Sequence, residues 1–179
     1  MRTLLSLVVG LSDKEHLSIR KANIMDICIL QKKDPETIAK LNRDVQEKHL
    51  KLFPNSFKEY DYLSILKAIK SFLDREESLS FIAYFQEEPI GYATVFERKY
   101  EENPFRKRYT SIVIDQMCVK KEFRAKGVGS RLVTTIRDYA KQRGIDKLEL
   151  SVWNQNEEAK SFYIRMGFST LIDYMRMEI

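Results

Sequence analysis

The most restrictive feature of this sequence is a glycine-containing turn between a strand pattern and a helix pattern. Residues Ser111–Val119 are rich in β-branched and apolar side chains, as in a buried strand. Downstream, apolar residues recur with the spacing of one helix face: Leu132, Val133, Ile136, Tyr139 and Ala140. Gly144 stands where a left-handed C-cap would end this helix. The segment Arg124–Gly129 is therefore predicted to join a strand to a helix.

Such a turn suits an anionic ligand. Gly127 and Gly129 allow positive φ and leave room for a ligand beside the backbone. The unpaired N–H groups at the start of the helix point one way, with the positive end of the helix dipole behind them. Five cationic residues surround the turn: Lys120, Lys121, Arg124, Lys126 and Arg131. For the glycine pair alone, an ordinary turn with solvated lysines is the simpler interpretation, because neither a Walker P-loop nor a full dinucleotide fingerprint is present.

A second motif changes that balance. A strand pattern at Lys147–Trp153 is followed by a helix pattern that begins at Asn156. The turn and this helix together resemble the GNAT superfamily of acetyl-coenzyme A-dependent N-acetyltransferases. The family's pyrophosphate loop corresponds to Arg124, Ala125, Lys126, Gly127, Val128 and Gly129, and its later motif to Asn156, Ala159, Phe162, Tyr163, Gly167 and Phe168. The clear match covers Ile112–Phe168, and a looser one extends from Ser18 to the C-terminus.

The resemblance implies a fold and a domain organisation. The fold class is mixed α/β (α+β): a mostly antiparallel sheet of six to seven strands, flanked by helices and splayed between the fourth and fifth strands. Residues 1–17 are expected to form an extension, helical or disordered, ahead of an N-acetyltransferase domain at 18–179. Arg2 and the apolar run Leu4–Leu11 have some character of a secretion signal, but the run is short and no cleavage site follows.

The elements expected before the turn follow from local patterns. Leu17–Ala22 is predicted to be the first strand. A helix is expected from Asp34-Pro35 to about Leu50, and a second over Phe57–Arg75 that buries Leu63, Leu66, Ile69, Phe72 and Leu73. Strands at Leu79–Gln86 and Ile90–Arg98 should form a hairpin with its turn at Glu87–Pro89. Thr170–Ile179 is expected to close the sheet with one or two strands.

The resemblance also implies roles for individual residues. The main chain of Met117, Cys118 and Val119 would run beside the pantetheine arm and polarise the thioester carbonyl. Residues Arg124 to Ser130 would hold the pyrophosphate. Asn156 would cap its helix and contact the pantetheine, close to Ala159 and Phe162.

Tyr163 and Asp115 are the candidate catalytic residues. An alkyl amine with a pKa of about 10.4 is neutral in only about one molecule in 2,500 at pH 7, so a base must help remove its proton. Tyr163, two helical turns after Asn156, would protonate the departing thiolate. Asp115 matches a position where some family members carry an acidic residue that acts through water. A local hydrogen bond at a strand end explains Asp115 equally well.

Composition limits the partners. The 179 residues are 44% hydrophobic and 32% charged, with a formal net charge of +5, values typical of a soluble globular domain. Acidic residues are interspersed with basic ones, so a polyanionic cosubstrate accounts for the local charge more simply than nucleic acid does. Cys28 and Cys118 form no disulfide framework and His16 and His49 are isolated, so no metal is predicted. No apolar run is long enough for a membrane span.

The sequence therefore predicts a cytoplasmic N-acetyltransferase that uses acetyl-CoA and an amine acceptor, either a small molecule or a peptide. A non-catalytic acyl-CoA-binding or sensing module is the alternative, and a nucleic-acid-binding domain is a second one. The acceptor, the acyl-chain preference and the oligomeric state stay open, although homodimers are common in the family.

Overall fold

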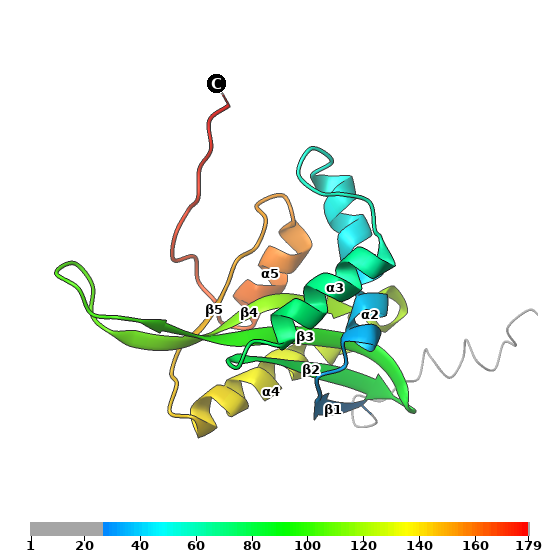
Figure 1. Cartoon of the computed structure of the whole chain (residues 1–179), viewed down its shortest axis with the longest axis horizontal. Coiled ribbons are helices and arrows are strands. Elements are labelled where there is room, and N and C mark those ends of the chain that lie inside the picture. Colours follow the sequence, from blue (N-terminus) through cyan, green and yellow to red (C-terminus); the bar gives the residue numbers. More distant parts are fainter. Residues whose placement is uncertain (1–26, 179) are drawn as a thin grey trace, which may run out of the picture.

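The computed structural model describes residues 27–178, which form one sheet with helices on both faces (Figure 1). The elements in chain order are β1 (Ile27–Gln31), α2 (Pro35–Leu52), α3 (Tyr62–Leu73), β2 (Ser78–Phe85), β3 (Glu88–Tyr100), β4 (Tyr109–Val119), the short 3₁₀ helix η2 (Lys121–Phe123), α4 (Val128–Gln142), β5 (Leu148–Leu150) and α5 (Glu157–Arg165). The mixed α/β class predicted from the sequence is confirmed.

The sheet has the strand order β1-β2-β3-β4-β5. The first four strands are antiparallel neighbours, and β5 runs parallel to β4. The pairing of β4 with β5 covers only Ile112–Ile114, although β4 continues to Val119. The two strands therefore separate beyond Ile114, which agrees with the predicted splay between the fourth and fifth strands.

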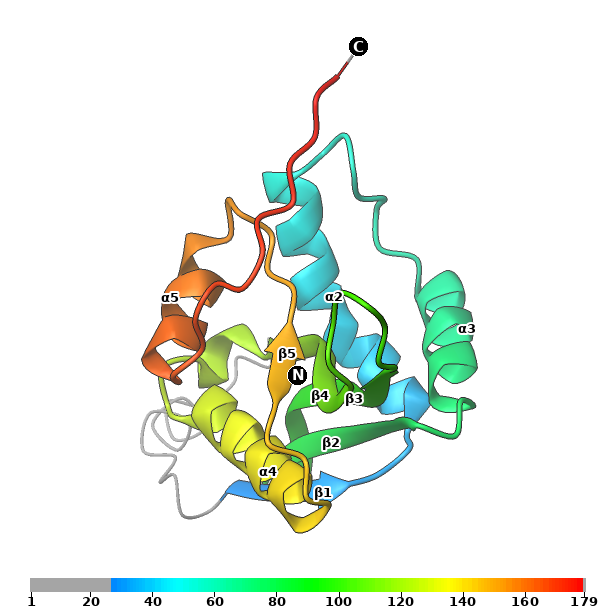
Figure 2. The same cartoon turned by 90° about the vertical axis from the view of Figure 1, so that its left-hand side faces the viewer.

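Each face of the sheet has its own helices. Helix α4 packs on one face through Leu132, Ile136 and Ala140. These side chains belong to a large apolar cluster that also contains residues of β1, β2, β3 and β4 and Phe123 of η2. Helices α2 and α3 cover the other face through Ile38, Leu41, Ile69 and Leu73. Figure 1 shows α4 below the sheet and α2 and α3 above it, and Figure 2 shows the same layers from the side.

A β-bulge interrupts β4 at Asp115. Thr94 of β3 lies opposite Gln116 and Val95 lies opposite Ile114, so Asp115 is the extra residue. Side chains alternate between the faces along an undisturbed strand, and one additional residue shifts that alternation. Asp115 and Gln116 consequently both lie on the α2–α3 face, while Ile114 and Met117 contact the apolar cluster under α4.

Several predicted boundaries hold and others need correction. Asp34 caps α2, with its carboxylate accepting from the N–H of Thr37 at 3.0 Å. Helix α3 starts later than Phe57 because Asp61 caps it through the N–H of Ser64, and the exposed Leu63 (71%) is not a core residue. The hairpin turns at Gln86 and Glu87, both with positive φ, rather than at Glu87–Pro89.

The predicted strands at the two ends of the chain fared differently. The strand expected at Leu17–Ala22 lies outside the described residues. Within them, β1 at Ile27–Gln31 is the first strand. The closing strands expected over Thr170–Ile179 are wrong for residues 170–178, which are extended without strand pairing. Leu171, Tyr174 and Met175 are 77–96% exposed there, so their apolar pattern finds no sheet edge to bury it. The described sheet has five strands instead of six to seven.

Candidate active site

The splay exposes the main chain at the end of β4. The N–H of Ile112 donates to Lys147 of the β5 side at 3.0 Å, and the N–H of Lys120 donates to Ile90 of β3 at 2.9 Å. Main-chain groups alternate in direction along a strand, and the bulge at Asp115 shifts that alternation by one residue. The N–H and C=O groups of Met117 and Val119 therefore face the side where β5 has already diverged.

The turn after β4 leads directly to the N-terminus of α4. Gly127 is the N-cap residue and has φ 82°, so the positive φ expected of this glycine is present. Ala125 also has positive φ, at 57°. No side chain caps α4, and its first helical hydrogen bond runs from Arg131 N–H to Gly127 C=O at 3.0 Å. The first N–H groups of α4, from Val128 to Ser130, thus lack helical acceptors.

Gly129 lies in a close packing contact, and its role in leaving room for a ligand stays a prediction. A Cβ placed on Gly129 would lie 3.2 Å from the ring of Phe162 on α5. The two predicted motifs therefore meet here, since Gly129 belongs to the turn motif and Phe162 to the later one. Close contact between α4 and α5 fixes the position of α5 beside the start of α4.

The cations around the turn have distinct surroundings. Arg124 donates from Nε to the C=O of Val119 at 3.0 Å, and its guanidinium lies 3.8 Å from the carboxylate of Asp44 on α2. Lys120 pairs with Glu88 at the start of β3. The ammonium of Lys126 stands 5.3 Å from the ring centre of Phe123. Arg124 and Lys126 therefore lie at the turn itself, whereas Lys120 lies at the neighbouring hairpin.

Helix α5 brings Asn156 and Tyr163 to the same region. Asn156 is buried and its Oδ1 accepts from the N–H of Ala159 at 3.4 Å, which confirms the predicted N-cap. Tyr163 packs edge-on against Phe162 and Phe168, with ring centres 5.1 and 5.6 Å away. Burial raises the pKa of the Tyr163 phenol to about 12, so the group keeps its proton at neutral pH and can donate it.

The thiol of Cys118, on β4, is not reactive. Its side chain is buried among residues of α2 and α3, and burial raises the pKa of the thiol to about 12. A thiol that stays protonated is a poor nucleophile. The side chain of Cys118 is therefore a core group.

On the α2–α3 face of the sheet a polar cavity of about 230 Å³ opens next to the bulge. Its polar lining comes from helix α2, the segment after α3, and strands β3 and β4: Asn42, Gln46, Arg75, Thr94, Asp115 and Gln116. Helix α3 supplies the apolar wall, which includes Ile65, Ile69 and Phe72. The cavity therefore lies at the bulge, directly before Met117 along β4.

Two polar atoms in this lining are buried without a partner. Asn42 and Thr94 are 4% and 2% exposed, and neither Oδ1 of Asn42 nor Oγ1 of Thr94 has a hydrogen-bond partner. The Asn42 side chain is held in place by its amide, which donates to the Tyr92 hydroxyl at 2.8 Å and to Oε1 of Gln116 at 2.9 Å. Buried polar atoms are normally hydrogen-bonded. Oδ1 of Asn42 and Oγ1 of Thr94 thus have unused hydrogen-bonding capacity next to the cavity.

Asp115 stands exposed at this cavity, yet protein atoms surround its carboxylate closely enough to affect it. Partial burial raises the pKa of Asp115, and the positive charges of Arg75 and Arg98 oppose that rise. Arg75 lines the same cavity, but the described residues include no ion pair between it and Asp115. A carboxylate with a raised pKa beside an open cavity has the character of a general base.

An aromatic cluster joins α2 to the segment before α5. Trp153 lies 4.8 Å from Phe53 and 5.0 Å from Phe57 between ring centres, and His49 lies 4.6 Å from Phe57. The ion pair of Lys48 with Glu158, at 2.6 Å, adds a second connection between α2 and α5. These contacts position α5 across the open end of the splay.

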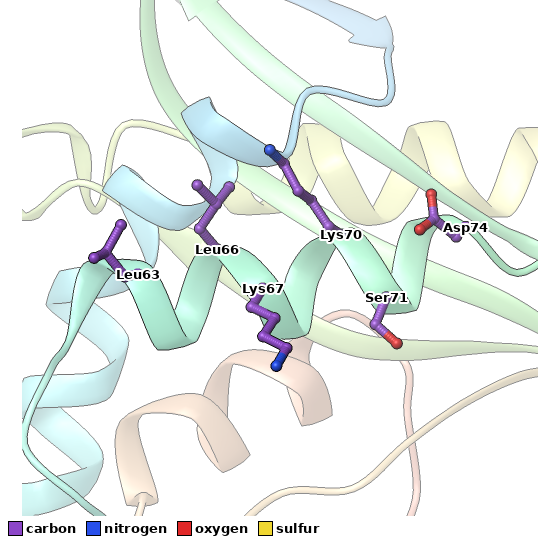
Figure 3. Close-up of a pocket in the computed structure, with 6 residues that line it drawn as sticks. All are labelled: Leu63, Leu66, Lys67, Lys70, Ser71 and Asp74. Atoms are coloured by element: carbon purple, nitrogen blue, oxygen red, sulfur yellow. The ribbon is translucent and has the colours of Figure 1, made fainter.

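A larger hollow, about 490 Å³, lies elsewhere on the outer surface of α3 (Figure 3). Its lining residues are Leu63, Leu66, Lys67, Lys70, Ser71 and Asp74, and Figure 3 shows Lys67 and Lys70 pointing in opposite directions. Lys70 is engaged by Glu36 at 2.8 Å. The hollow contains none of the predicted site residues, so its volume does not locate the functional site.

Two further findings concern residues 27–178. No helix there is both long and apolar enough to cross a membrane. Among the same residues no group of three or more His, Cys, Asp or Glu side chains is arranged to hold a metal ion.

The strands β4 and β5 splay apart, the N-terminus of α4 is uncapped, and α5 with Tyr163 lies beside it. These features together define a class of protein, and a comparison of the sequence with family models gives the same class. The model described as "Acetyltransferase (GNAT) family" matches residues 42–168. The chain therefore belongs to the GNAT family of acetyltransferases.

Individual relatives are similar over part of their length. The uncharacterized N-acetyltransferase MJ1207 of Methanocaldococcus jannaschii is 26% identical over 138 residues, which are 74% of this chain and 60% of that protein. The uncharacterized N-acetyltransferase YhfO of Bacillus subtilis is 29% identical over 100 residues, 56% of this chain and 64% of that protein. The chain thus spans less than two thirds of the length of these relatives.

Solved structures show the same fold at low identity. A tetramutant of the BH1408 protein from Bacillus halodurans superimposes with a TM-score of 0.79 at 22% identity, covering 85% of this chain and 99% of that one. The aminoglycoside N-acetyltransferase AAC(6')-Iy in complex with CoA gives a TM-score of 0.62 at 18% identity, covering 86% and 93%.

The polar cavity was missed by sequence reasoning, although part of it had a signal. Asn42 follows Ile38 by one helical turn and so interrupts the apolar stripe of α2 with a polar side chain. Thr94 is similarly a polar residue on the buried side of β3. Gln116 had no such signal, because its direction depends on the bulge.

Proposed function

We propose that this protein transfers an acetyl group from acetyl-CoA to a primary amine, and that residues 18–179 form the domain that does so. The observation that carries the proposal is the junction between β4 and α4. There the main chain of Met117 and Val119 faces the open splay. The uncapped N-terminus of α4 follows after η2 and a short turn. Both offer hydrogen-bond donors to a ligand with an anionic end and a carbonyl group.

The turn fits the diphosphate of coenzyme A. The N–H groups of Val128, Gly129 and Ser130 lack helical acceptors, and the positive end of the α4 dipole lies behind them. Arg124 and Lys126 add positive charge, and Ala125 and Gly127 hold the positive-φ backbone that shapes the turn. Acetyl-CoA supplies the thioester, whose carbonyl we place at the main chain of Met117 and Val119.

The polar cavity is our candidate for the acceptor site. In the reaction the neutral amine nitrogen bonds to the acyl carbon and the carbon–sulfur bond breaks. A bound ammonium loses two protons on the way to the amide: the first leaves before attack, and we assign it to the carboxylate of Asp115, directly or through water; the second leaves once the nitrogen is bonded to the acyl carbon. Tyr163, whose phenol is protonated at neutral pH, donates its proton to the departing thiolate and regains one as the nitrogen gives up its second proton. Asn156, Ala159 and Phe162 position this face of α5 beside the thioester.

Replacement of the Tyr163 hydroxyl tests the catalytic part of the proposal. In Tyr163→Phe, kcat should fall by about hundredfold or more, the usual contribution of a general acid. The Kd for acetyl-CoA, measured by calorimetry, should stay within about twofold because the pyrophosphate contacts are intact. Tyr174→Phe is the matched control, since Tyr174 is 96% exposed. An unchanged kcat would remove Tyr163 from the mechanism.

Calorimetry with acetyl-CoA tests the proposal as a whole. We expect a binding heat and an increase in Tm on addition of the ligand. Absence of both would overturn the proposed function. Binding without acetyl transfer to any amine in a broad panel would indicate an acyl-CoA-binding module instead.

A further inference from the structure

The hydrogen-bonding groups that line the polar cavity next to the bulge are not evenly distributed. Asn42, Thr94 and Asp115 line it together, and Oδ1 of Asn42 and Oγ1 of Thr94 are buried without partners. A carboxylate and an amide oxygen only accept hydrogen bonds at neutral pH, and a hydroxyl can also accept. This part of the cavity therefore requires a ligand rich in donors.

A primary ammonium group meets that requirement. It carries three N–H donors in a compact head, and it brings a positive charge to the carboxylate of Asp115. A hydroxyl or a secondary amide supplies only one donor and would leave acceptors unpaired, at a cost in affinity. The Asn42 oxygen is held rigidly, because its amide bonds both Tyr92 and Gln116, so the acceptor position is set before a ligand arrives.

A second charge of opposite sign lines the same cavity. Arg75 follows α3, its guanidinium lies 5.5 Å from the ring centre of Phe72, and it forms no ion pair among the described residues. Arg98 is a further cation close enough to influence Asp115. Ile65, Ile69 and Phe72 form an apolar wall. The cavity lining thus combines acceptors, a hydrocarbon wall and a guanidinium without an ion pair in the described part of the chain.

We propose that the acceptor is a small primary amine that also bears a carboxylate, with its ammonium among Asn42, Thr94 and Asp115 and its carboxylate at Arg75. The inference rests on the proposed function, because it names the substrate class of that site. A guanidinium binds a carboxylate through two parallel hydrogen bonds. A second ammonium would be repelled there, so diamines and polyamines are disfavoured. The volume of about 230 Å³ suits a molecule smaller than a drug-sized ligand.

Binding measurements on the full 179-residue chain test the inference without relying on turnover. With coenzyme A present, calorimetric titration compares three amines of equal backbone length: γ-aminobutyrate, n-butylamine and putrescine. We expect γ-aminobutyrate to bind about tenfold or more tightly than n-butylamine, the effect of one charge-assisted pair, and putrescine to bind most weakly. Glycine and β-alanine extend the series to shorter spacings between the charges. Equal affinities for carboxylate-bearing and plain amines at every length, or tighter binding of putrescine, would overturn the inference.

Two variants test the carboxylate contact and the ammonium contact separately. Arg75→Gln should abolish the preference for the carboxylate and leave n-butylamine binding within about twofold, whereas Thr94→Val should weaken all the amines by about fivefold or more. Arg143→Gln is the matched control, because Arg143 pairs with Glu97 and stacks on Tyr139 of α4. A carboxylate preference that survives Arg75→Gln contradicts the assignment. Acetyl-CoA binding distinguishes the two levels: if it is normal while the amine results fail, only the inference falls, and if it is absent, the proposed function falls with it.

Discussion

The two faces of the sheet differ in the side chains that they bury. Under α4 the buried cluster is entirely apolar, from Ile27 through Leu132 to Ile145. Under α2 and α3 the apolar cluster is half as large, and polar side chains such as Asn42 and Thr94 are buried within the same layer. All three buried polar atoms without a partner in residues 27–178 come from Asn42, Thr94 and Ser78.

Strand alternation places Ser78 and Thr94 on the face of the sheet that α2, the helix of Asn42, covers. On β2 and β3, Leu79, Ala93 and Val95 belong to the α4 cluster, so their neighbours Ser78 and Thr94 point to the α2–α3 side. A buried polar atom without a partner costs stability. The face under α4 therefore stabilises the fold, while the face under α2 and α3 retains groups whose hydrogen bonds a ligand can complete.

The largest effect is expected on the α4 face. Leu132 is fully buried, so Leu132→Ala removes three buried carbons and leaves a cavity that should cost about 2–5 kcal/mol of unfolding free energy. Urea unfolding followed by circular dichroism measures it. Leu63→Ala on α3 is the control, because Leu63 is 71% exposed and should change stability by less than about 0.5 kcal/mol. Equal losses for the two variants would contradict the assigned core.

The second effect concerns Asp115 on the opposite face. As a general base it must be ionised, so the rate should fall as pH drops through its pKa, which burial raises above the ordinary value. Asp115→Asn should lower kcat/KM by about hundredfold near neutral pH and remove that limb of the profile. Asp146→Asn is the control, because Asp146 pairs with Lys147 at the surface. A low-pH limb that persists in Asp115→Asn would exclude Asp115 as the base.

The same substitution has a stability signature of predictable sign. A raised pKa means that folded Asp115 binds its proton more tightly than the unfolded chain does. Ionisation of Asp115 therefore destabilises the fold as pH rises from the unfolded pKa through the folded one. Asp115→Asn should be the more stable protein above that window, and the difference should vanish below it.

The smallest effect is also the most diagnostic of the contrast. Thr94→Val replaces an unpaired buried hydroxyl with a methyl group of similar size, so unfolding free energy should rise by about 1 kcal/mol. Thermal unfolding measures this increase. A loss of stability would show that the hydroxyl has a partner in the folded protein and that this face is not kept polar for a ligand.

Much of this architecture could be predicted from local pattern. Asp34 and Asn156 cap helices because a side-chain oxygen can satisfy a nearby N–H without help from the rest of the chain. The stripe of α4 and the positive φ at Gly127 and Gly144 follow from equally local rules. The family motifs then fixed the sheet class, because they relate this chain to proteins that share its long-range pairing.

Errors arose where a residue's environment depends on distant chain. Leu63 fits the apolar spacing of α3 but is 71% exposed, because spacing along a helix does not show which part of its apolar face other elements cover. Residues 170–178 have strand-like composition, yet pairing requires a free edge in register. The packing contact of Gly129 was not predicted either, because its partner Phe162 lies on another helix.

The sequence by itself determined the helix boundaries set by caps, the turn between β4 and α4, and the family. Tertiary structure alone decided the bulge at Asp115, and with it the direction of Gln116, Met117 and Val119. The physical reason is that a bulge is a mismatch between two strands: its position depends on which residues pair across the sheet, and no property of either strand alone specifies it.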